Sequence, residues 1–457
     1  MLISLISFSQ NLGLSPYSKT TFGDINSNTG NRDEDMGHVG VANHSSDAFS
    51  IANPAFLHNN VYPNNSGKFT YFDFSLTGKA TTFKSNEGKD QAFGGTFNRI
   101  AIKIPINNYK KTIHKWGLAF VVRPYSNLNY NFSGTNKIVG DTMTYNYSNN
   151  GSGGLTNLTI GNGIKLSKNL SIGLNTSYIF GKYIRKNQTT LNDGNDRTFS
   201  FVDENRMSFW LLQPGIAYTG NFNKIDSVLI TKNIFDSITG ISKKVQFKVL
   251  DTIPSNLFYN IGLTYEYGFA YQNILNTYKR EYNSTSSFNT IDTLNNVNLA
   301  LNNIPGEIKF GAGLSNLEYR MIPNWATSFQ ISYRPWKQYN ASLKYRNTIS
   351  IGAGYEKRIV LGKNKKEKLT FLRAGLFYNQ LPYSFNNTYI DEKGITFGGT
   401  LNLPQIKGLN DRMLLSLGLT LGERGSLKNN LIQEKYIKFS LGFTFMEDRW
   451  FYRYKLD

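Results

Sequence analysis

Residues Ile437 to Phe445 read Ile-Lys-Phe-Ser-Leu-Gly-Phe-Thr-Phe, and this stretch decides the fold. Every odd position is a large apolar residue, and every even position is lysine, serine, glycine or threonine. Because successive side chains of a β-strand point to opposite faces, all the apolar side chains fall on one face. One apolar face and one polar face are typical of a membrane barrel strand, which has lipid outside and a polar interior.

The same alternation recurs through the rest of the chain. Clear examples begin at Phe72, Ile100, Trp116, Leu170 and Tyr259. Less regular strands fit near residues 156–166, 206–220, 306–316, 326–335, 344–357, 368–378, 394–402 and 412–421. We therefore expect an all-β fold, a transmembrane antiparallel β-barrel of about 14 strands, an even number as such barrels usually have.

Connection lengths support this arrangement. With the N-terminus on the periplasmic side, short links such as 167–169 and 403–410 also fall there, and long links such as 125–154 and 271–304 fall outside. Outer-membrane barrels prefer this asymmetry. Residues 221–255 break it, since they should be periplasmic but are far longer than a turn. They are either an inserted hairpin or a long periplasmic loop.

Composition excludes several other classes of protein. The chain has no cysteine, so it has neither disulfides nor thiolate metal sites. Its mean hydropathy of −0.38 argues against a helical membrane protein, and no apolar run reaches the roughly 18 residues that a membrane helix needs. The net charge of +19 does not indicate nucleic acid, because many lysines lie in short connections. Anionic lipid head groups attract cations placed there.

The N-terminal part divides into two segments. Residues 1–10 resemble the apolar part of a secretory signal, and we interpret them as its remnant, with cleavage near Gln10. A short apolar tail is the alternative. Residues 11–66 are rich in Asn, Ser and Gly, and we expect them to form a hatch, or plug, inside the barrel of residues 67–457. A disordered periplasmic leader is the alternative. Within 11–66, Ser45, Ser46 or Asp47 could cap a short helix through Phe49 and Ala52 that Pro54 would end.

Catalytic chemistry finds little support. The four histidines are His38, His44 and His58 in the expected hatch and His114 in a short link. No Gly-x-Ser-x-Gly elbow accompanies them, and none lies in an expected strand. We therefore predict no catalytic residues, no metal site and no cofactor. The glycine pairs 161/163, 311/313 and 352/354 lie inside strands, so they indicate bends or clearance in the lumen rather than nucleotide-binding loops.

Three charged residues, Asp73, Lys103 and Arg123, should point into the lumen if the alternation holds. They would either guide a solute or hold the hatch. Pairing of charges across the barrel wall is an equally good interpretation.

Gln213-Pro214-Gly215 interrupts an otherwise apolar-periodic strand. Proline removes one ladder donor, and a closed barrel has no free edge to accommodate it. We expect a bulge there. It would be either a lateral opening for a hydrophobic solute or, as we favour, a simple curvature bulge.

Several motifs point to a known family. Gly37-His-Val-Gly40-Val-Ala42, followed by Asn53-Pro54-Ala55, resembles the N-terminal hatch of the FadL/TodX hydrocarbon-transport family, also called the OMPP1 family. Ser15-Pro-Tyr-Ser18, Phe22-Gly-Asp24 and Asp448-Arg-Trp-Phe451 resemble its PorV-related subgroup. The resemblance implies a fourteen-stranded barrel with an N-terminal plug, and Gly37, Gly40, Asn53, Pro54 and Ala55 as the hatch motif.

From this resemblance we expect a channel in the outer membrane of a Gram-negative bacterium, for passive uptake of hydrophobic small molecules. The alternative is a non-transporting accessory or scaffold subunit of an outer-membrane secretion or assembly complex. The expected partners are outer-membrane lipids and lipopolysaccharide, a hydrophobic small-molecule ligand and an outer-membrane protein complex, but no nucleic acid.

Overall fold

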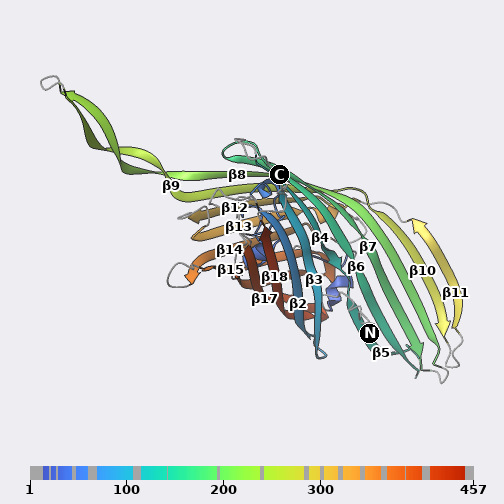
Figure 1. The fold of residues 1–457 in the computed structure, drawn as a ribbon. Coiled ribbons are helices and arrows are strands. Elements are labelled where there is room, and N and C mark those ends of the chain that lie inside the picture. Colours follow the sequence, from blue (N-terminus) through green and yellow to red (C-terminus); the bar gives the residue numbers. More distant parts are fainter. Residues whose placement is uncertain are drawn as a thin grey trace, which may run out of the picture.

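The first and last strands of the wall pair with each other. In the computed structural model, β18 (Gln433–Glu447) pairs with β17 (Arg412–Arg424) on one side and with β2 (Thr70–Lys84) on the other. The sheet thereby closes into an antiparallel barrel of 14 strands, which confirms the expected fold class (Figure 1). The structure describes residues 14–19, 22–26, 29–43, 48–59, 69–106, 115–140, 143–192, 196–236, 241–282, 288–298, 303–316, 323–339, 345–361, 368–385, 387–403 and 412–447.

The remaining strands follow one another around the wall. They are β3 (Lys89–Pro105), β4 (Trp116–Asn127), β5 (Tyr130–Lys137), β6 (Thr144–Lys165), β7 (Leu170–Leu191), β8 (Thr198–Asp236), β9 (Ile241–Gly268), β10 (Gln272–Tyr282), β11 (Phe288–Asn298), β12 (Glu307–Asn316), β13 (Trp325–Arg334), β14 (Thr348–Leu361), β15 (Lys368–Phe385) and β16 (Thr388–Asn402). β5 follows β4 along the edge of β6, and β10 follows β9 along the edge of β8 and carries β11. The short helical turns are η1 (Pro16–Lys19), α1 (Asn31–Asp35), η2 (Pro54–Phe56), η3 (Trp336–Gln338) and η4 (Lys428–Asn430).

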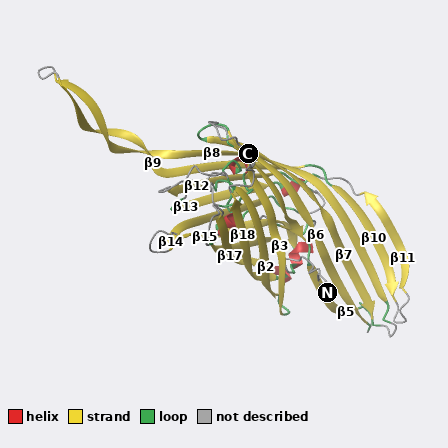
Figure 2. Ribbon diagram, in the orientation of Figure 1, coloured by secondary structure: helices red, strands yellow, loops and turns green. Residues whose placement is uncertain are grey.

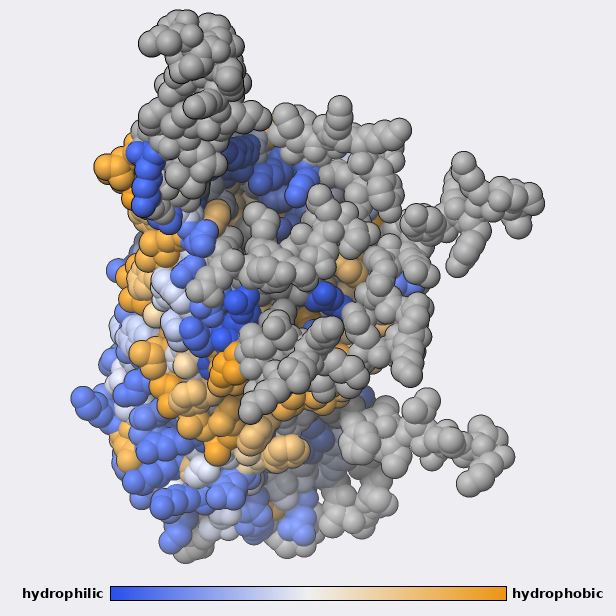
Figure 3. Space-filling model, turned by 60° about the vertical axis from the view of Figure 1, so that its left-hand side comes forward, coloured by the Kyte–Doolittle hydropathy of each residue, from blue (hydrophilic) through white to orange (hydrophobic). Residues whose placement is uncertain are grey.

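The outer face of the wall is apolar, as the alternation in β18 predicts. Ile437, Phe439 and Phe443 are exposed on this face, whereas Ser440 and Thr444 are buried inside. The nine residues from Ile437 to Phe445 match the roughly 9–11 residues with which a tilted strand crosses a membrane. Figure 3 shows hydrophobic side chains gathered over the wall. Among the described residues, no helix is long and apolar enough to cross a membrane.

The two ends of the barrel differ. We call one the turn end, where β3, β6, β12, β14, β16 and β18 end and β4, β7, β13, β15 and β17 begin. We call the other the loop end, where β5, β10 and β11 extend the wall and η3 and η4 lie in the connections. Figure 1 shows β5, β10 and β11 on the side of the molecule away from the outer parts of β8 and β9.

Residues 221–255 belong to a hairpin that leaves the barrel at the turn end. β8 and β9 remain paired from Asn223 and Pro254 to Asp236 and Ile241. Over this stretch neither strand pairs with the neighbouring wall strands β7 and β12. The hairpin therefore projects beyond the wall, as Figure 1 shows.

The helical turns of the N-terminal segment lie inside the barrel, as the ribbon coloured by secondary structure shows (Figure 2). The short helix expected through Phe49 and Ala52 is wrong, because these residues are not helical and η2 begins only at Pro54. Its expected caps, Ser45, Ser46 and Asp47, lie outside the described residues, as do residues 1–10, His44, His114 and Asp448–Phe451.

Candidate functional site

The described N-terminal residues 14–59, which we call the hatch, run down the lumen from the loop end to the turn end. At the loop end, the backbone amide of Ser15 donates to the carbonyl oxygen of Asn129 over 2.8 Å, beyond the end of β4. α1 packs halfway down against β15, β16 and β17. η2 packs near the turn end against β6, β7 and β8. The hatch therefore fills much of the lumen along its length.

The Asn53-Pro54-Ala55 motif anchors the lower part of the hatch. The Asn53 side-chain oxygen accepts from the amide of Ala55 over 3.0 Å and so caps η2, with Pro54 at its first position. The Asn53 amide nitrogen donates to the carbonyl oxygen of Val41 over 2.9 Å and to that of Ile216 in β8 over 3.1 Å. One side chain thus joins two hatch segments to the wall.

Glycines in the wall let the hatch backbone lie directly against it. A Cβ atom at Gly163, Gly173 or Gly215 would collide with Asn53, Pro54 or the backbone beside them. Further along the wall, the space of a Cβ atom is also taken by hatch backbone at Gly262, Gly352, Gly354 and Gly375. Clearance in the lumen, rather than strand bending alone, therefore explains the pair 352/354 and Gly163.

Gly37 and Gly40 connect α1 to the wall. The amide of Gly37 donates to the Thr396 hydroxyl over 2.9 Å, and that hydroxyl donates to the carbonyl oxygen of Asp35 over 2.8 Å. Gly37 has a φ of 75°, a left-handed conformation that glycine adopts without strain. The amide of Gly40 donates to the side-chain oxygen of Gln330 in β13 over 2.9 Å.

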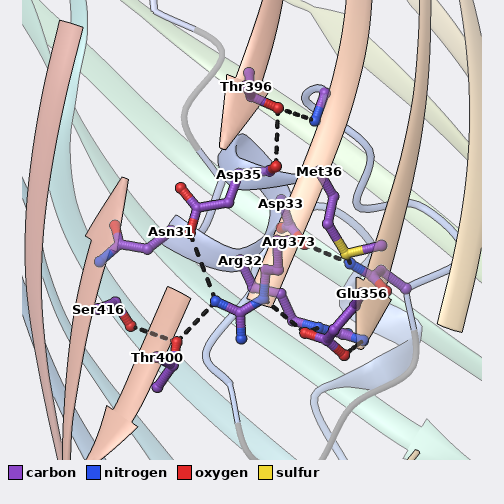
Figure 4. Close-up of polar contacts among 12 residues, drawn as sticks. Asn31, Arg32, Asp33, Asp35, Met36, Glu356, Arg373, Thr396, Thr400 and Ser416 are labelled. Carbon is purple, nitrogen blue, oxygen red and sulfur yellow. Dashed lines mark hydrogen bonds and ion pairs between the residues drawn. The ribbon is translucent and has the colours of Figure 1, made fainter. Parts of the chain in front are cut away.

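A buried network of four charges joins α1 to the wall (Figure 4). Arg32 donates from Nε and Nη2 to the two carboxylate oxygens of Glu356 in β14, over 2.9 and 2.7 Å. Arg373 in β15 donates from Nε to Glu356 over 2.6 Å and lies 3.5 Å from the Asp35 carboxylate. All four side chains are at most 3% exposed. Two positive and two negative charges therefore compensate one another out of contact with water.

Asp33 holds the hatch together internally. Its carboxylate accepts from the hydroxyls of Thr29 and Ser50 and from the side-chain amide of Asn43. Burial raises the pKa of Asp33, against these three hydrogen bonds and Arg32, which lower it. Three hatch segments thus meet at one carboxylate.

The three charged residues that the alternation assigned to the lumen all lie on the inner face. Lys103 donates to the carbonyl oxygen of Asn59 over 2.8 Å, and Arg123 donates to that of Asn26 over 2.9 Å, so both hold the hatch. Asp73 instead pairs with Arg99 in the neighbouring strand, at 2.6 Å.

Gln213-Pro214-Gly215 forms no bulge, contrary to our expectation. β8 keeps one register with β7 through all three residues and the same register with β9 on either side, but Gln213 and Pro214 themselves form no pair with β9. Gln213 donates from its side-chain nitrogen to the carbonyl oxygen of Ala52 over 3.1 Å. This stretch is therefore a contact surface for the hatch. The lateral opening that the sequence suggested here remains an untested hypothesis.

A luminal cavity of about 250 Å³ lies between the upper hatch and the wall. Aromatic side chains line part of it, among them Phe22 of the hatch and Trp336, whose rings lie 6.4 Å apart. Behind this lining, Phe22 also packs 5.7 Å from the rings of Tyr271 and Tyr339. Charged residues line the rest. The apolar lining of the luminal cavity includes Phe22, Ile25, Ile51, Tyr125, Leu211, Trp336 and Tyr345, and its charged lining includes Asp24, Arg123, Glu266, Glu307, Lys309, Arg334, Glu392 and Arg424.

The charges around the luminal cavity are largely paired. Arg334 donates to Glu266 and to Glu307, each over 2.6 Å. Arg424 donates to both carboxylate oxygens of Asp24 in the hatch over 2.8 Å. The lining is therefore mixed, with an aromatic part and a fixed polar part.

The wall is unpaired along one seam beside this cavity. β3 and β4 pair only from Pro105 and Gly117 to Ile100 and Val122. Toward the loop end β3 pairs with β2 alone, while β4 pairs with β1 (Asp24–Ile25) of the hatch. Ile25, which lines the luminal cavity, is 41% exposed. A hatch strand thus occupies the edge of β4 that β3 leaves free.

The two described histidines have structural contacts. The ring of His38 lies edge-on against Phe377 with centroids 4.6 Å apart, and burial lowers its pKa to about 4. His58 Nδ1 lies 2.7 Å from the carbonyl oxygen of Ala55. Over the described part of the chain, no three His, Asp or Glu residues are grouped so that they could hold a metal ion.

Sequence reasoning missed three wall residues that bind the hatch, Glu356, Arg373 and Gln330. One signal was present: Arg32-Asp33-Glu34-Asp35 is a dense run of charge within a segment expected to be enclosed. Enclosed charges need partners, and the partners had to be inward-facing charged residues of the strands.

This fold and site define a plugged β-barrel of the FadL-like kind, with a hatch bonded to its inner wall. The family model described as BamG matches residues 1–457, and the chain belongs to the BamG family. No curated protein matches it.

Solved structures share the fold at low sequence identity. The CymD monoaromatic hydrocarbon channel is 11% identical over 91% of this chain and 97% of its own, with a TM-score of 0.51. The toluene transporter TodX of Pseudomonas putida is 12% identical over 92% and 98%, also with 0.51. A FadL homologue of Pseudomonas aeruginosa is 10% identical over 92% and 97%, with 0.52. The resemblance to the PorV-related subgroup stays a prediction.

Proposed function

We propose that this protein is a passive channel of the Gram-negative outer membrane for small hydrophobic molecules. In this proposal, solute enters at the loop end, occupies the luminal cavity and leaves sideways through the seam between β3 and β4 into the bilayer. The monoaromatic hydrocarbon channel CymD and the toluene transporter TodX, which share the fold, support it at that level.

The observation that carries the proposal is that the same edge of β4 pairs with β3 near the turn end and with β1 of the hatch near the loop end. A closed barrel with a complete ladder has no sideways exit, because every backbone group is bonded to a neighbour. Here β1 of the hatch takes the place that β3 leaves, through the pairs Asp24–Asn127 and Ile25–Ser126. Two residues of pairing, together with the contacts of Arg424 with Asp24 and of Arg123 with Asn26, are still far fewer than a wall strand makes, so β1 is suited to act as the gate.

The size of the luminal cavity sets the scale of the solute. An apolar protein cavity of about 150 Å³ accepts benzene, so the 250 Å³ found here suits a compact molecule of somewhat larger size. The lining is not wholly apolar, in contrast to the dry pocket expected for a hydrocarbon. The paired charges of Arg334 and Arg424 lie on one part of it, and the aromatic rings offer the apolar contact.

A disulfide across β1 and β4 tests the gate. Ile25 and Ser126 are direct partners in an antiparallel pair, at the spacing that disulfides need, and the chain has no cysteine of its own. We expect the oxidised Ile25→Cys/Ser126→Cys variant to take up deuterated toluene no faster than cells lacking the protein, because β1 can no longer leave β4. Reduction should restore uptake.

Two controls accompany this experiment. Each single cysteine variant should transport normally, since it removes a side chain without fixing the gate. The pair Thr77→Cys/Ser440→Cys joins β2 to β18, which are wall strands in continuous register, and its disulfide should not change uptake. If the bridged Ile25–Ser126 variant takes up toluene at the unmodified rate, the seam is not the exit.

A second candidate function, an accessory or scaffold subunit of an outer-membrane complex, is favoured by one observation. The β8–β9 hairpin keeps its pairing from Asn223–Pro254 to Asp236–Ile241 outside the wall, where it contributes nothing to barrel closure. Replacing residues 224–253 with a short turn should leave the barrel folded, which heat-modifiable gel mobility would show. Loss of a stoichiometric partner on gentle extraction, with uptake unchanged, would favour the scaffold role.

A further inference from the structure

The lipid-facing side of β2, β16, β17 and β18 carries two adjoining grooves, of about 780 and 880 Å³, which we call the lower and upper grooves. The outward-facing lining of the lower groove includes Leu76, Gly78, Leu372, Phe397, Gly399, Leu401, Leu417, Leu419, Phe439 and Leu441. That of the upper groove includes Ala80, Thr82, Gln91, Phe93, Lys393, Ile395, Leu421, Glu423, Lys435 and Ile437. Both lie on the outside of the barrel and are separate from the luminal cavity.

Strand pairing places these side chains in rows across the wall. Gly78 lies beside Phe439 on one side and Gly95 on the other, which leaves a stretch of the outer face without side chains. A Cβ atom on Gly78 would meet nothing nearer than 3.7 Å. Unlike the inward glycines, Gly78 is therefore not required by the packing of the protein. Because Gly78 has no side chain, the outer face of the wall has room there for a molecule bound from the membrane side.

Charge marks the loop-end edge of the same grooves. Lys393, Glu423 and Lys435 are direct neighbours in one row, immediately above the apolar row that contains Ile437. Both lysines are exposed, and neither forms an ion pair with any residue of the described structure. Glu423 accepts a hydrogen bond from Gln433 over 2.7 Å. One row further out, Lys84 and Lys89 are paired neighbours and are also exposed.

We propose that these grooves bind the lipid A part of lipopolysaccharide, with its acyl chains in the grooves and its phosphates at Lys393 and Lys435. The apolar rows lie at the depth of acyl chains, and the lysine row lies where the apolar band ends, at head-group depth. Lysine acts as a point charge toward phosphate. Two adjoining grooves fit a lipid with several chains better than one with two. The proposal rests on the outer-membrane location proposed above, with the loop end outside.

Native mass spectrometry of the purified full-length protein with added lipid A tests the site. The double variant Lys393→Gln/Lys435→Gln should bind lipid A about 25-fold more weakly, taking roughly fivefold for each cation near an anionic head group. Gly78→Leu should weaken binding by filling the lower groove. Glu423→Gln should strengthen it, because it removes the one negative charge of the row.

Matched controls lie elsewhere on the same outer face. Lys357 is an exposed lysine near the turn end of β14, and Ala353 is a small exposed residue of the same strand. Lys357→Gln and Ala353→Leu should leave lipid A binding unchanged, and heat-modifiable gel mobility should show every variant folded. The proposal fails if the lysine variants bind lipid A normally, or if phosphatidylglycerol binds as tightly as lipid A. Because the readout is lipid binding, it is independent of whether toluene uptake depends on the seam.

Discussion

Replacing Glu356 with glutamine is expected to release α1 from the barrel wall. Glu356 accepts from both Arg32 and Arg373, and the substitution removes the one carboxylate that both buried cations contact. Breaking a buried ion pair by removing one partner costs about 3–5 kcal/mol, because an uncompensated charge stays away from water. The protein should therefore favour states in which the hatch leaves its seat.

Hydrogen exchange of the α1 amides measures this effect. If seating of the hatch limits exchange, protection at residues 31–35 should fall by roughly two to four orders of magnitude, the equivalent of about 3–5 kcal/mol. Single-channel conductance should rise in parallel, since the lumen opens. The same substitution at Glu204, which pairs with the exposed cations Lys182 and Arg206 at the loop end, is the control. It should alter neither measurement, because exposed ion pairs contribute little.

Unchanged protection in Glu356→Gln would mean that the network is not what seats α1. The remaining contacts of α1 would then carry the attachment, among them the ion pair of Glu34 with Lys438 at 3.4 Å and the close backbone contacts around Gly37. Loss of the whole barrel would be visible as lost heat-modifiable mobility, so it cannot be mistaken for release of the hatch.

The sequence predicted the wall well because the physics of the wall is local. Each strand has lipid on one side and lumen on the other, so alternation alone fixes which way a side chain points. Phe439 faces lipid and Ser440 faces the lumen for this reason. Strand count and barrel closure then follow from the number of alternating stretches.

The attachment of the hatch could not be predicted in the same way. The partners of Arg32 and Gly40 lie about 300 residues further along the chain, and alternation says only that such residues face inward. The bulge expected at Pro214 illustrates the limit. Pro214 does interrupt the pairing of β8 with β9, but no extra residue is inserted, and the adjacent Gly215 is explained by the close approach of Asn53 and Pro54. The pairing at the seam between β3 and β4 could not be predicted either, because its partner, β1 of the hatch, lies about 100 residues before that part of β4 in the sequence.

The contacts between the hatch and the inward glycines of the wall can be tested by adding a single methyl group. Gly375→Ala in β15 adds one methyl group on the inner face, where the nearest atoms are the backbone of Met36 and Gly37. Backbone cannot move aside as a flexible side chain can. Inserting a methyl into a packed interface typically costs about 1–3 kcal/mol. We expect α1 to be displaced, with faster hydrogen exchange at residues 31–35 and raised conductance.

Gly78→Ala is the matched control, since it adds the same methyl group to the opposite face of the wall. There the nearest atom, Cζ of Phe93, would be 3.7 Å away, an ordinary van der Waals contact. It should leave α1 exchange and conductance unchanged, because nothing in the protein needs that space. Equal effects of the two substitutions would mean that glycine matters for the strands themselves. A difference confined to Gly375→Ala would show that the inward glycines hold the hatch in place by close backbone contact, independently of the charges at Glu356.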